Sequence, residues 1–427
     1  MEQIRENLIE EFGWRGLVFQ ISNEDKLALH LSEPRSVYCG FDPTADSLHI
    51  GSLVPLLALR RFQLAGHRPI LLLGGATGLI GDPSGRADER NLNQQGTVAQ
   101  WVEKLRTQVG RFLDFDGANA ATVCNNLDWT QQLDVISFLR DVGKHFSVNA
   151  MVQRDSVKAR LEREDQGISY TEFSYMLLQA MDFLELARRE GCLLQIGGSD
   201  QWGNIISGID LIRRHTGQEA FALTMPLVTK ADGSKFGKTA SGAVWLDAHK
   251  TSPYSFYQFW LNSADADIEK FLKLFTFMSE ADIADLVARS QQAPEQRLAQ
   301  RELARQVTEL VHGEDAVTSA ERISASLFGG DEASLQREDL KQLQLDGVPS
   351  VAVSPGDGLL NTMVAVGAAK SSGEARKLIQ GRGVRLNGLQ VEDPKLAVVF
   401  DDAYFGEFFL LRKGKKQHFL LVKSQLD

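Results

Sequence analysis

Two lysines stand close together in the run GSKFGKT at residues 233–239 and suggest phosphate chemistry. A P-loop needs four residues between its first glycine and the Gly-Lys-Thr, because that length lets successive backbone N–H groups wrap a phosphate. Here only three residues separate Gly233 from Gly237. A P-loop nucleotidase is therefore excluded, and the presence of Lys235 and Lys238 needs another explanation.

A histidine follows the first strand pattern, in the segment YCGFDPTADSLHIGS at 38–52. The strand ends at Gly40, and a helix is expected to start near Ser47 and to carry His49. A helix N-terminus offers unpaired N–H donors and a partial positive charge, so a phosphate could bind there with His49 and Thr44 as added donors. A lone histidine in a first turn is more often a surface or capping residue. The spacing leaves both interpretations open.

The glycine-rich run GGATGLIGDPSGRADER at 74–90 also follows an apolar strand. It is not a dinucleotide fingerprint, because Ala76 stands where a glycine is required. Its glycines let a ligand approach the backbone, and Asp82 lies beyond the carboxyl end of the strand, where open α/β sheets bind ligands. An ordinary strand-to-helix turn explains the run equally well.

The stretch TEFSYMLLQAMDFLELARR has helical periodicity and carries one polar stripe. Tyr175, Gln179 and Asp182 fall on one face, at positions i, i+4 and i+7. Apolar residues fill most of the remaining circumference, which indicates a largely buried helix. The stripe could line a cavity, but Glu185 and Arg189 extend the same general face. Periodicity alone therefore favours a solvent-facing stripe.

Composition indicates a globular protein of two or three domains. The chain has 427 residues, of which 43% are apolar and 24% charged. No apolar run reaches membrane-spanning length, and the N-terminal sequence has the pattern of a charged amphipathic helix, so we expect a cytoplasmic protein. Cys39, Cys124 and Cys192 are far apart in sequence and support neither a disulfide framework nor a zinc site.

Charge is distributed unevenly along the chain. The net charge is −10, but residues 361–427 contain 11 Lys and Arg against 7 Asp and Glu, a net of +4 that leaves −14 for the rest. The segments KLIQGRGVR and RKGKK gather several of these cations. Such a cluster is typical of an RNA-binding patch, although a solvated basic surface is an equally good explanation.

The elements expected along the chain divide it into regions. Residues 37–230 alternate apolar runs with amphipathic helical stretches, which predicts parallel βαβ units. Residues 253–329 are helix-rich, the polar stretch 330–358 with Gly and Pro predicts a linker, and 359–427 combine a helical pattern with strand candidates. We therefore expect an α/β domain, a helical region and a small α+β domain.

Taken together, these motifs resemble a known family. PTADSLHIGS is similar to the HIGH signature of class I aminoacyl-tRNA synthetases, and KFGKT to their KMSKS loop. Between them YCGFDPT, GGATGLIGDPSG, NNLDW, YTEFSYMLLQAMDF and QIGGSDQWGN resemble bacterial tyrosyl-tRNA synthetases in the expected order, and SSGEARKLIQGRGVRLNG resembles their terminal RNA-binding module. The resemblance covers essentially the whole chain.

The resemblance implies a domain plan. It has a Rossmann-like parallel-sheet catalytic domain at 1–230, a KMSKS-type loop region at 231–252, a helical anticodon-side domain at 253–329, a linker at 330–358 and a ribosomal-protein-like RNA-binding domain at 359–427.

The resemblance also implies roles for single residues. The tyrosine site would comprise Tyr38 and Asp182 on the phenolic hydroxyl, Tyr175, Gln179 and Asp82 on the α-ammonium, Gln201 near the carboxylate and Asn126 as support. The ATP site would comprise Gly40, Asp42, Gly51, Ser52, Gly198 and Asp200, with Thr44, His49, Lys235, Lys238 and Thr239 as catalytic residues around the phosphates.

The implied reaction is tyrosine activation by ATP followed by transfer to tRNA(Tyr). The tyrosine carboxylate is already a competent nucleophile, so catalysis requires positioning and charge stabilisation. Two lysines on a glycine-rich loop would neutralise the departing pyrophosphate, which explains a run that is not a P-loop. Mg²⁺ would be carried by ATP, with no protein-bound metal. The resemblance further suggests a homodimer with tRNA crossing between subunits.

Two alternatives share parts of this pattern. A tryptophanyl-tRNA synthetase would need to recognise an indole N–H, which the pairing of Tyr38 with Asp182 suits less well. A catalytically silent RNA-binding protein would explain the basic tail, but Lys235 and Lys238 argue against it. The chain has no inserted segment large enough for an editing domain.

Two positions depart from the family pattern. Ser52 stands where the signature usually ends in His or Asn, and its hydroxyl has a shorter reach toward a ribose. Arg86 stands where a lysine is common, which keeps the charge but changes the geometry. We expect Ser52→Ala to weaken activation less than His49→Ala, as measured by ATP–pyrophosphate exchange.

Overall fold

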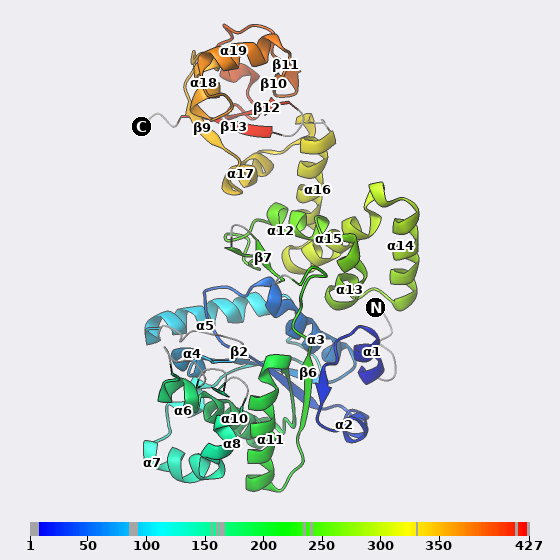
Figure 1. The fold of residues 1–427 in the computed structure, drawn as a ribbon, viewed down its shortest axis with the longest axis vertical. Helices are drawn as coiled ribbons and strands as arrows, with labels where there is room; N and C mark the ends of the chain where they lie inside the picture. Colours follow the sequence, from blue (N-terminus) through cyan, green and yellow to red (C-terminus); the bar gives the residue numbers. More distant parts are fainter. Residues whose placement is uncertain are drawn as a thin grey trace. The chain divides into compact units, whose positions relative to one another are not determined.

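A computed structural model describes residues 8–84, 93–154, 157–158, 161, 167–233, 236–239, 242–329, 332–414 and 417–424. The chain divides into two compact units (Figure 1). The first contains residues 1–247 and 263–303, and the second contains 248–262 and 304–427. Within the described ranges, no helix is both long and apolar enough to cross a membrane.

A six-stranded sheet, in the order β1-β6-β5-β2-β3-β4, forms the centre of the first unit. Its strands are β1 (Gln20–Ile21), β2 (Ser36–Phe41), β3 (Arg68–Leu73), β4 (Thr122–Asn125), β5 (Leu194–Gly198) and β6 (Phe221–Met225). All neighbours run parallel except β1, which pairs antiparallel with β6. Strand β2 has two neighbours in the sheet: β3, the next strand along the chain, on one side, and β5 on the other. Ligands bind at the carboxyl ends of strands where the order reverses in this way.

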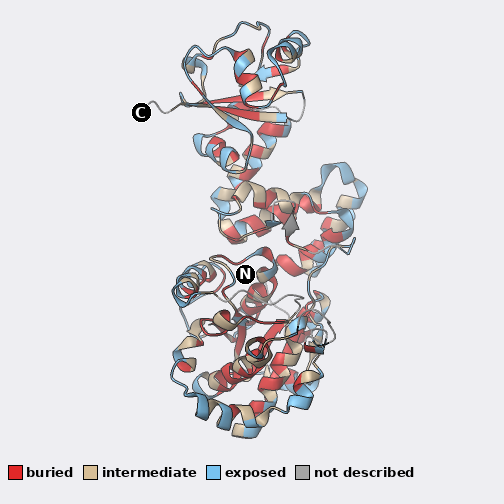
Figure 2. Ribbon diagram, turned by 60° about the vertical axis from the view of Figure 1, so that its left-hand side comes forward, coloured by how far each residue is buried: buried red, intermediate tan, exposed pale blue. Residues whose placement is uncertain are grey.

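Helices cover both faces of this sheet. The helices of the first unit are α1 (Leu8–Trp14), α2 (Glu24–His30), α3 (Leu53–Leu64), α4 (Thr77–Ile80), α5 (Gln95–Val109), α6 (Leu127–Thr130), α7 (Val135–Ser137), α8 (Val148–Val152), α10 (Tyr170–Glu190), α11 (Trp202–Thr216), α13 (Asp265–Phe275) and α14 (Glu280–Gln292). The short helical turns are η1 (Ile50–Ser52), η2 (Phe138–Val142), η3 (Gly143–His145), η4 (Ser199–Gln201) and η5 (Pro294–Gln296). Strands β7 (Lys238–Thr239) and β8 (Gly242–Ala243) form a small hairpin. Helix α3 packs on β2, β3 and β5, whereas α11 packs on β5, β6 and α10. Figure 2 shows the buried residues concentrated on the strands and on the inward helix faces.

The helix predicted to start near Ser47 begins later than expected. His49 has an extended backbone and caps η1, and α3 starts only at Leu53. The helix predicted at 171–189 is α10, whose ends are set by the N-cap Ser169 and by Gly191 in the left-handed region.

A five-stranded sheet, in the order β11-β10-β12-β13-β9, forms the second unit together with helices. Its strands are β9 (Ser350–Val353), β10 (Val384–Leu386), β11 (Leu389–Gln390), β12 (Phe408–Lys413) and β13 (Gln417–Lys423). Its helices and turns are α12 (Pro253–Leu261), α16 (Glu314–Gly329), η6 (Glu332–Ser334), α17 (Arg337–Leu345), α18 (Leu359–Ala365), α19 (Ser372–Gln380) and η7 (Phe400–Asp402). Helix α15 (Leu298–His312) contains the boundary between the two units. The segment VVFDDAY, a strand candidate in the sequence, contains the turn η7.

The stretch 330–358 is not the linker that its polar composition predicted. It contains α17, whose Leu340 and Leu343 are buried, and β9, which pairs parallel with β13. The helix-rich segment 253–329 is divided as well, because α12 and α16 belong to the second unit and α13 and α14 to the first.

Candidate active site

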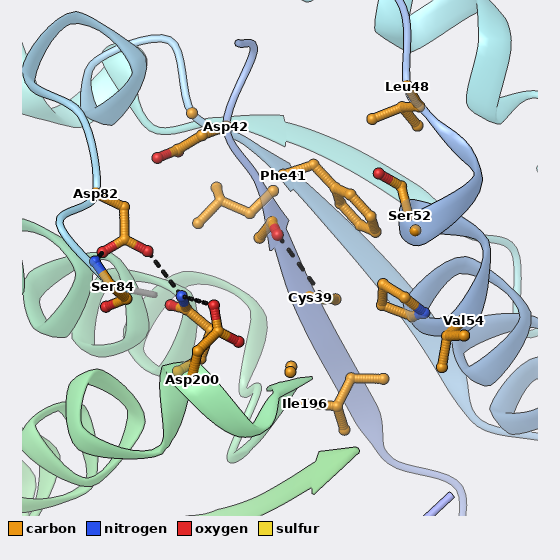
Figure 3. A pocket seen from close by; sticks show the side chains of 18 of the residues that line it. Cys39, Phe41, Asp42, Leu48, Ser52, Val54, Asp82, Ser84, Ile196 and Asp200 are labelled. Carbon is orange, nitrogen blue, oxygen red and sulfur yellow. Dashed lines mark hydrogen bonds between the residues drawn. The ribbon is translucent and has the colours of Figure 1, made fainter. Parts of the chain in front are cut away.

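A cavity of about 490 Å³ lies at the carboxyl ends of β2 and β5, in the first unit. Figure 3 shows Asp82, Ser84 and Asp200 on one side of the view, and Leu48, Ser52 and Val54 on the other. This is the place where the reversal of strand order predicts a ligand site.

Most of the residues singled out in the sequence line this one cavity. They are Tyr38, Gly40, Asp42, Thr44, His49, Gly51, Ser52, Asp82, Asn126, Tyr175, Gln179, Asp182, Gly198, Asp200 and Gln201. Lys235 and Arg86 lie outside the described residues, and only the backbone of Lys238 and Thr239 is described. The polar stripe of α10 faces the cavity, so the solvent-facing orientation favoured by periodicity is wrong for its first three members.

The carboxylate of Asp182 is held by two donors at the inner end of the cavity. Asn126 Nδ2 donates to Oδ2 at 2.9 Å, and Trp129 Nε1 donates to Oδ1 at 2.8 Å. Burial raises the pKa of Asp182 to about 7, although these two hydrogen bonds act in the opposite direction. Asn126 is itself fixed, because its Oδ1 accepts from the Ala76 backbone N–H at 2.7 Å. The carboxylate is therefore a pre-oriented acceptor in an apolar environment.

Two other buried polar groups face the same cavity. The Tyr38 hydroxyl and the Gln195 Oε1 have no hydrogen-bond partner within the described part of the chain. The two residues are register partners on β2 and β5. An unpaired buried polar group costs about 1–3 kcal/mol. A ligand that carries a hydroxyl or an amide-like group would satisfy them.

The hydroxyl of Tyr175 is bonded across the cavity to Asp42. Tyr175 Oη donates to Asp42 Oδ2 at 2.7 Å, and Thr77 Oγ1 donates to Oδ1 at 2.6 Å. Gly74 makes this possible, because a Cβ there would come within 2.0 Å of Asp42 Oδ1. Burial, and then the charge of Asp42, raise the pKa of Tyr175 well above its usual value.

Two further carboxylates border the cavity near α11. Asp82 accepts from Gln201 Nε2 at 2.7 Å and from the Ser84 backbone N–H at 2.9 Å. Burial, and then the charge of Asp82, raise the pKa of Asp200. Together with Asp42 these groups give the middle of the cavity a negative potential, which favours an ammonium group or hydroxyl donors.

His49 both caps a turn and lines the cavity. Its Nδ1 accepts from the Gly51 backbone N–H at 3.0 Å. The ring proton therefore resides on Nε2, which is able to donate to a ligand. A side chain at Gly51 would collide with this ring, since its Cβ would lie 2.8 Å from His49 Cε1. The capping and ligand-binding interpretations left open by the sequence are compatible.

Sequence reasoning missed Trp129 and Gln195. Trp129 stands within NNLDW, but its contact with Asp182 depends on how α6 packs on α10. Gln195 gave one usable signal, a polar side chain inside an otherwise apolar strand. Across the part of the chain that the structure describes, no group of three or more His, Cys, Asp and Glu is placed to hold a metal ion.

Comparison with known families supports one fold and one chemistry. Residues 31–329 match the family described as tRNA synthetases class I (W and Y), and residues 339–421 match the tyrosine–tRNA ligase SYY-like C-terminal domain. Tyrosine–tRNA ligases of Klebsiella pneumoniae (strain 342) and Escherichia coli (strain 55989 / EAEC) are 55% identical over 417 residues, which is 97% of this chain and 98% of each relative.

Solved structures agree with this comparison. A C-terminally truncated Aspergillus nidulans mitochondrial tyrosyl-tRNA synthetase is 30% identical with a TM-score of 0.68, covering 76% of this chain and 95% of that one. A tryptophanyl-tRNA synthetase from Encephalitozoon cuniculi bound to tryptophan is 13% identical with a TM-score of 0.52, covering 78% and 89%. The latter similarity concerns the fold alone.

Proposed function

The chain belongs to the tyrosine–tRNA ligases, a family of class I tRNA synthetases, and from this we propose that the cavity at the carboxyl ends of β2 and β5 is its active site. The enzyme activates L-tyrosine with ATP to tyrosyl-adenylate and pyrophosphate, and then transfers tyrosine to the 3′ end of tRNA(Tyr).

The phenolic hydroxyl of tyrosine binds between Asp182 and Tyr38. The observation that carries this assignment is the fixed carboxylate of Asp182 in a buried cavity that also contains the unpartnered hydroxyl of Tyr38. The substrate hydroxyl donates to the carboxylate and accepts from Tyr38. Phenylalanine would leave the Tyr38 hydroxyl unpaired and would give Asp182 no donor beyond Asn126 and Trp129, a rule of selectivity for which tyrosyl-tRNA synthetases are themselves the standard example.

The α-ammonium of tyrosine binds farther out, at Asp82, Tyr175 and Gln179. Carboxylates surround that part of the cavity, so a cation is stabilised there. Gln201, which is bonded to Asp82, stands beside the substrate carboxylate. The two ends of the amino acid are thereby fixed, and its carboxylate points toward the ATP site.

The adenosine of ATP lies against the ends of β2 and β5. Gly40 has open space where a side chain would project, which allows a ligand to approach the strand closely. Asp42, Asp200, Gly51, Ser52 and Gly198 complete this side. The phosphates extend toward Thr44 and His49, where the Nε2–H of His49 donates to them.

Catalysis consists of positioning and charge stabilisation. The tyrosine carboxylate oxygen attacks the α-phosphorus, the bond to the bridging oxygen of the β-phosphate breaks, and pyrophosphate leaves with the bonding electron pair. Lys235 and Lys238 neutralise that leaving group, and the Thr239 hydroxyl donates a hydrogen bond to it. Mg²⁺ would accompany ATP, bound chiefly through phosphate oxygens and water, and would neutralise part of the phosphate charge.

We propose further that the enzyme is a homodimer joined through the region around α7 and α8. Large apolar side chains are exposed there, namely Leu133, Val135, Ile136, Leu139 and Val148. Such clusters on a surface mark protein interfaces. Ile136→Asp should yield a monomer in analytical ultracentrifugation, and a dimer that persists would place the interface elsewhere.

Tyrosine-dependent ATP–pyrophosphate exchange tests the site assignment. We expect the wild type to exchange with L-tyrosine and not with phenylalanine or tryptophan. Asp182→Asn should abolish tyrosine dependence, and Asp128→Asn, a carboxylate outside the cavity, should leave it intact. Equal effects of the two substitutions would contradict the assignment.

A further inference from the structure

The run that carries the two lysines is fixed on both sides by neighbouring elements. On the entry side, Lys270 Nζ of α13 donates to the Thr229 carbonyl at 2.9 Å, and Asp267 Oδ1 accepts from the Ala231 backbone N–H at 2.7 Å. Asp267 is buried. Contacts with α13 therefore fix the position of the chain at residues 229–231, immediately before this run.

On the return side, the chain pairs directly with the histidine segment. Leu246 N donates to Leu48 O and Ile50 N donates to Val244 O, both at 2.9 Å. His49 forms an antiparallel bridge with Trp245, and their rings lie 6.3 Å apart. Backbone hydrogen bonds thus join the chain that follows the lysine run to the segment that contains His49, and so hold the two signature segments next to each other.

Between these two attachments, Phe236 is the one large apolar side chain in a run of small and polar residues. Its ring lies 5.1 Å from that of Phe271 and stacks at 5.2 Å on that of Phe275, both on α13. The next residue, Gly237, has a φ of 78°, and a Cβ there would come within 2.5 Å of Ile50 Cγ2. These contacts place residues 236 and 237 between α13 and the segment that contains His49, with no room for a side chain at position 237.

Helix α13 is in turn fixed to α3, the helix that follows His49. Arg61 of α3 donates through Nη2 to the Thr276 carbonyl at 2.6 Å and to the Leu274 carbonyl at 3.4 Å, at the C-terminal end of α13. A guanidinium at a helix C-terminus satisfies carbonyls that have no partner within the helix. Helix α13, on which Phe236 packs, is thus held to helix α3, which follows His49, and the two helices form one frame.

We infer that Phe236 is a positioning residue for the diphosphate-binding lysines: its ring, held on Phe271 and Phe275, fixes the course of the segment that presents Lys235 and Lys238 to the leaving group. The inference rests on the proposed role of the lysines. Phe236 lies one residue after Lys235 and two before Lys238, so an error in its position is passed directly to both. Misplacing a catalytic group by about 1 Å is able to lower a rate about a hundredfold.

The test is a double-mutant cycle on the full-length enzyme, read by ATP–pyrophosphate exchange. Phe236→Ala should lower kcat about tenfold to a hundredfold and leave the KM for tyrosine within about twofold, because Phe236 is not among the residues assigned to tyrosine. In a background that carries both Lys235→Ala and Lys238→Ala, the same substitution should have little further effect, since it acts through the two lysines. Phe236→Leu, which keeps apolar contact without the stacked ring, should give an intermediate loss.

The matched control is Phe277→Ala. That ring lies 4.7 Å from the Arg61 guanidinium and belongs to the same frame. The loss from Phe277→Ala should multiply with that of the paired lysine substitutions, and Phe277→Ala should change the thermal midpoint at least as much as Phe236→Ala does. If the loss from Phe236→Ala multiplies with that of the paired lysine substitutions, the positioning role is overturned. If Lys235→Ala alone leaves exchange unchanged, the proposed role of the lysine fails, and the inference fails with it.

Discussion

At the scale of single residues, the proposed tyrosine site depends on how the carboxylate of Asp182 is supported. Asp182 sits on a stripe whose spacing was visible in the sequence, but its burial was not. Glu185, on the same general face, carries ion pairs with Arg188 and Arg189, so the stripe is half cavity wall and half surface. Periodicity predicts which residues share one face of a helix, but it does not predict which part of that face is buried and which part is exposed to solvent.

The first prediction concerns the indole that holds Asp182. Trp129→Phe removes the N–H donor at 2.8 Å and keeps most of the apolar contact. A hydrogen bond to a charged group contributes about 1.5–3 kcal/mol, so the KM for tyrosine should rise about tenfold or more while the KM for ATP stays the same. Steady-state exchange kinetics measure both constants. Trp101→Phe, on α5 and outside the cavity lining, is the control, and an equal rise there would contradict the prediction.

The second prediction is a pH dependence. Burial raises the pKa of Asp182 from 3.8 to about 7, and the ionised form is the one that accepts the phenolic hydrogen bond. The kcat/KM for tyrosine should therefore fall as pH drops through about 7 and level off above it. In Trp129→Phe this inflection should move to higher pH, because the lost hydrogen bond lowered the pKa of Asp182.

The same shift has a consequence for stability, with the opposite direction in pH. A carboxyl whose pKa is higher in the folded state binds a proton that the unfolded chain has released. Asp182 therefore lowers the free energy of unfolding progressively as pH rises from about 4 to about 7. The ionised Asp182 that the proposed activity requires above neutral pH therefore lowers the free energy of unfolding, and such a trade-off is common at active sites.

At the scale of elements, some boundaries were readable and others were not. Helix α10 was predicted almost to its ends from its apolar periodicity over 171–189, and the structure shows that Ser169 and Gly191 set those ends. Helix α17 was missed, because its apolar residues are few and its composition is polar. Its fold depends on distant partners: Asp339 accepts from Arg322 and Ser319 of α16 at 2.6 Å each. No local pattern contains that information.

The third prediction tests whether the stretch taken for a linker is structural. Leu340→Ala removes a fully buried side chain of α17 and should lower the free energy of unfolding by about 2–4 kcal/mol. Leu345→Ala, on the same helix but 84% exposed, should change it by less than about 0.5 kcal/mol. Urea titration followed by circular dichroism measures both. Equal midpoints for the two variants would mean that this stretch behaves as a linker after all.

At the scale of the whole molecule, the alternation of apolar strands and helices sufficed to predict a parallel sheet followed by a smaller α+β domain. The division of the helical segment was not predictable. Helix α12 packs on α16 in the second unit, where Gln258 Nε2 donates to Ser324 Oγ at 2.7 Å. Composition is uniform along residues 253–329, so only long-range contacts distinguish which unit each helix joins.

The last prediction separates the two steps of the reaction between the two units. Arg376 and Lys377 are exposed on α19, beside the exposed Arg382 and Arg385, in the unit whose last residues have a net positive charge. If this basic patch contacts the tRNA backbone, Arg376→Glu with Lys377→Glu should leave ATP–pyrophosphate exchange unchanged. It should lower the kcat/KM for tRNA charging about tenfold or more, and the slope of log affinity against log salt should fall by about one for each lost phosphate contact.

The control for that experiment changes an equal kind of charge elsewhere in the same unit. Lys341→Glu on α17 reverses an exposed lysine outside the patch and should leave both steps within about twofold. Because the residues proposed for adenylate formation all lie in the first unit, a parallel loss of exchange and charging in the α19 variant would contradict the separation. A loss of charging with an unchanged salt slope would show that the patch supports the fold of the second unit and does not bind phosphate, since counterion release accompanies every neutralised phosphate.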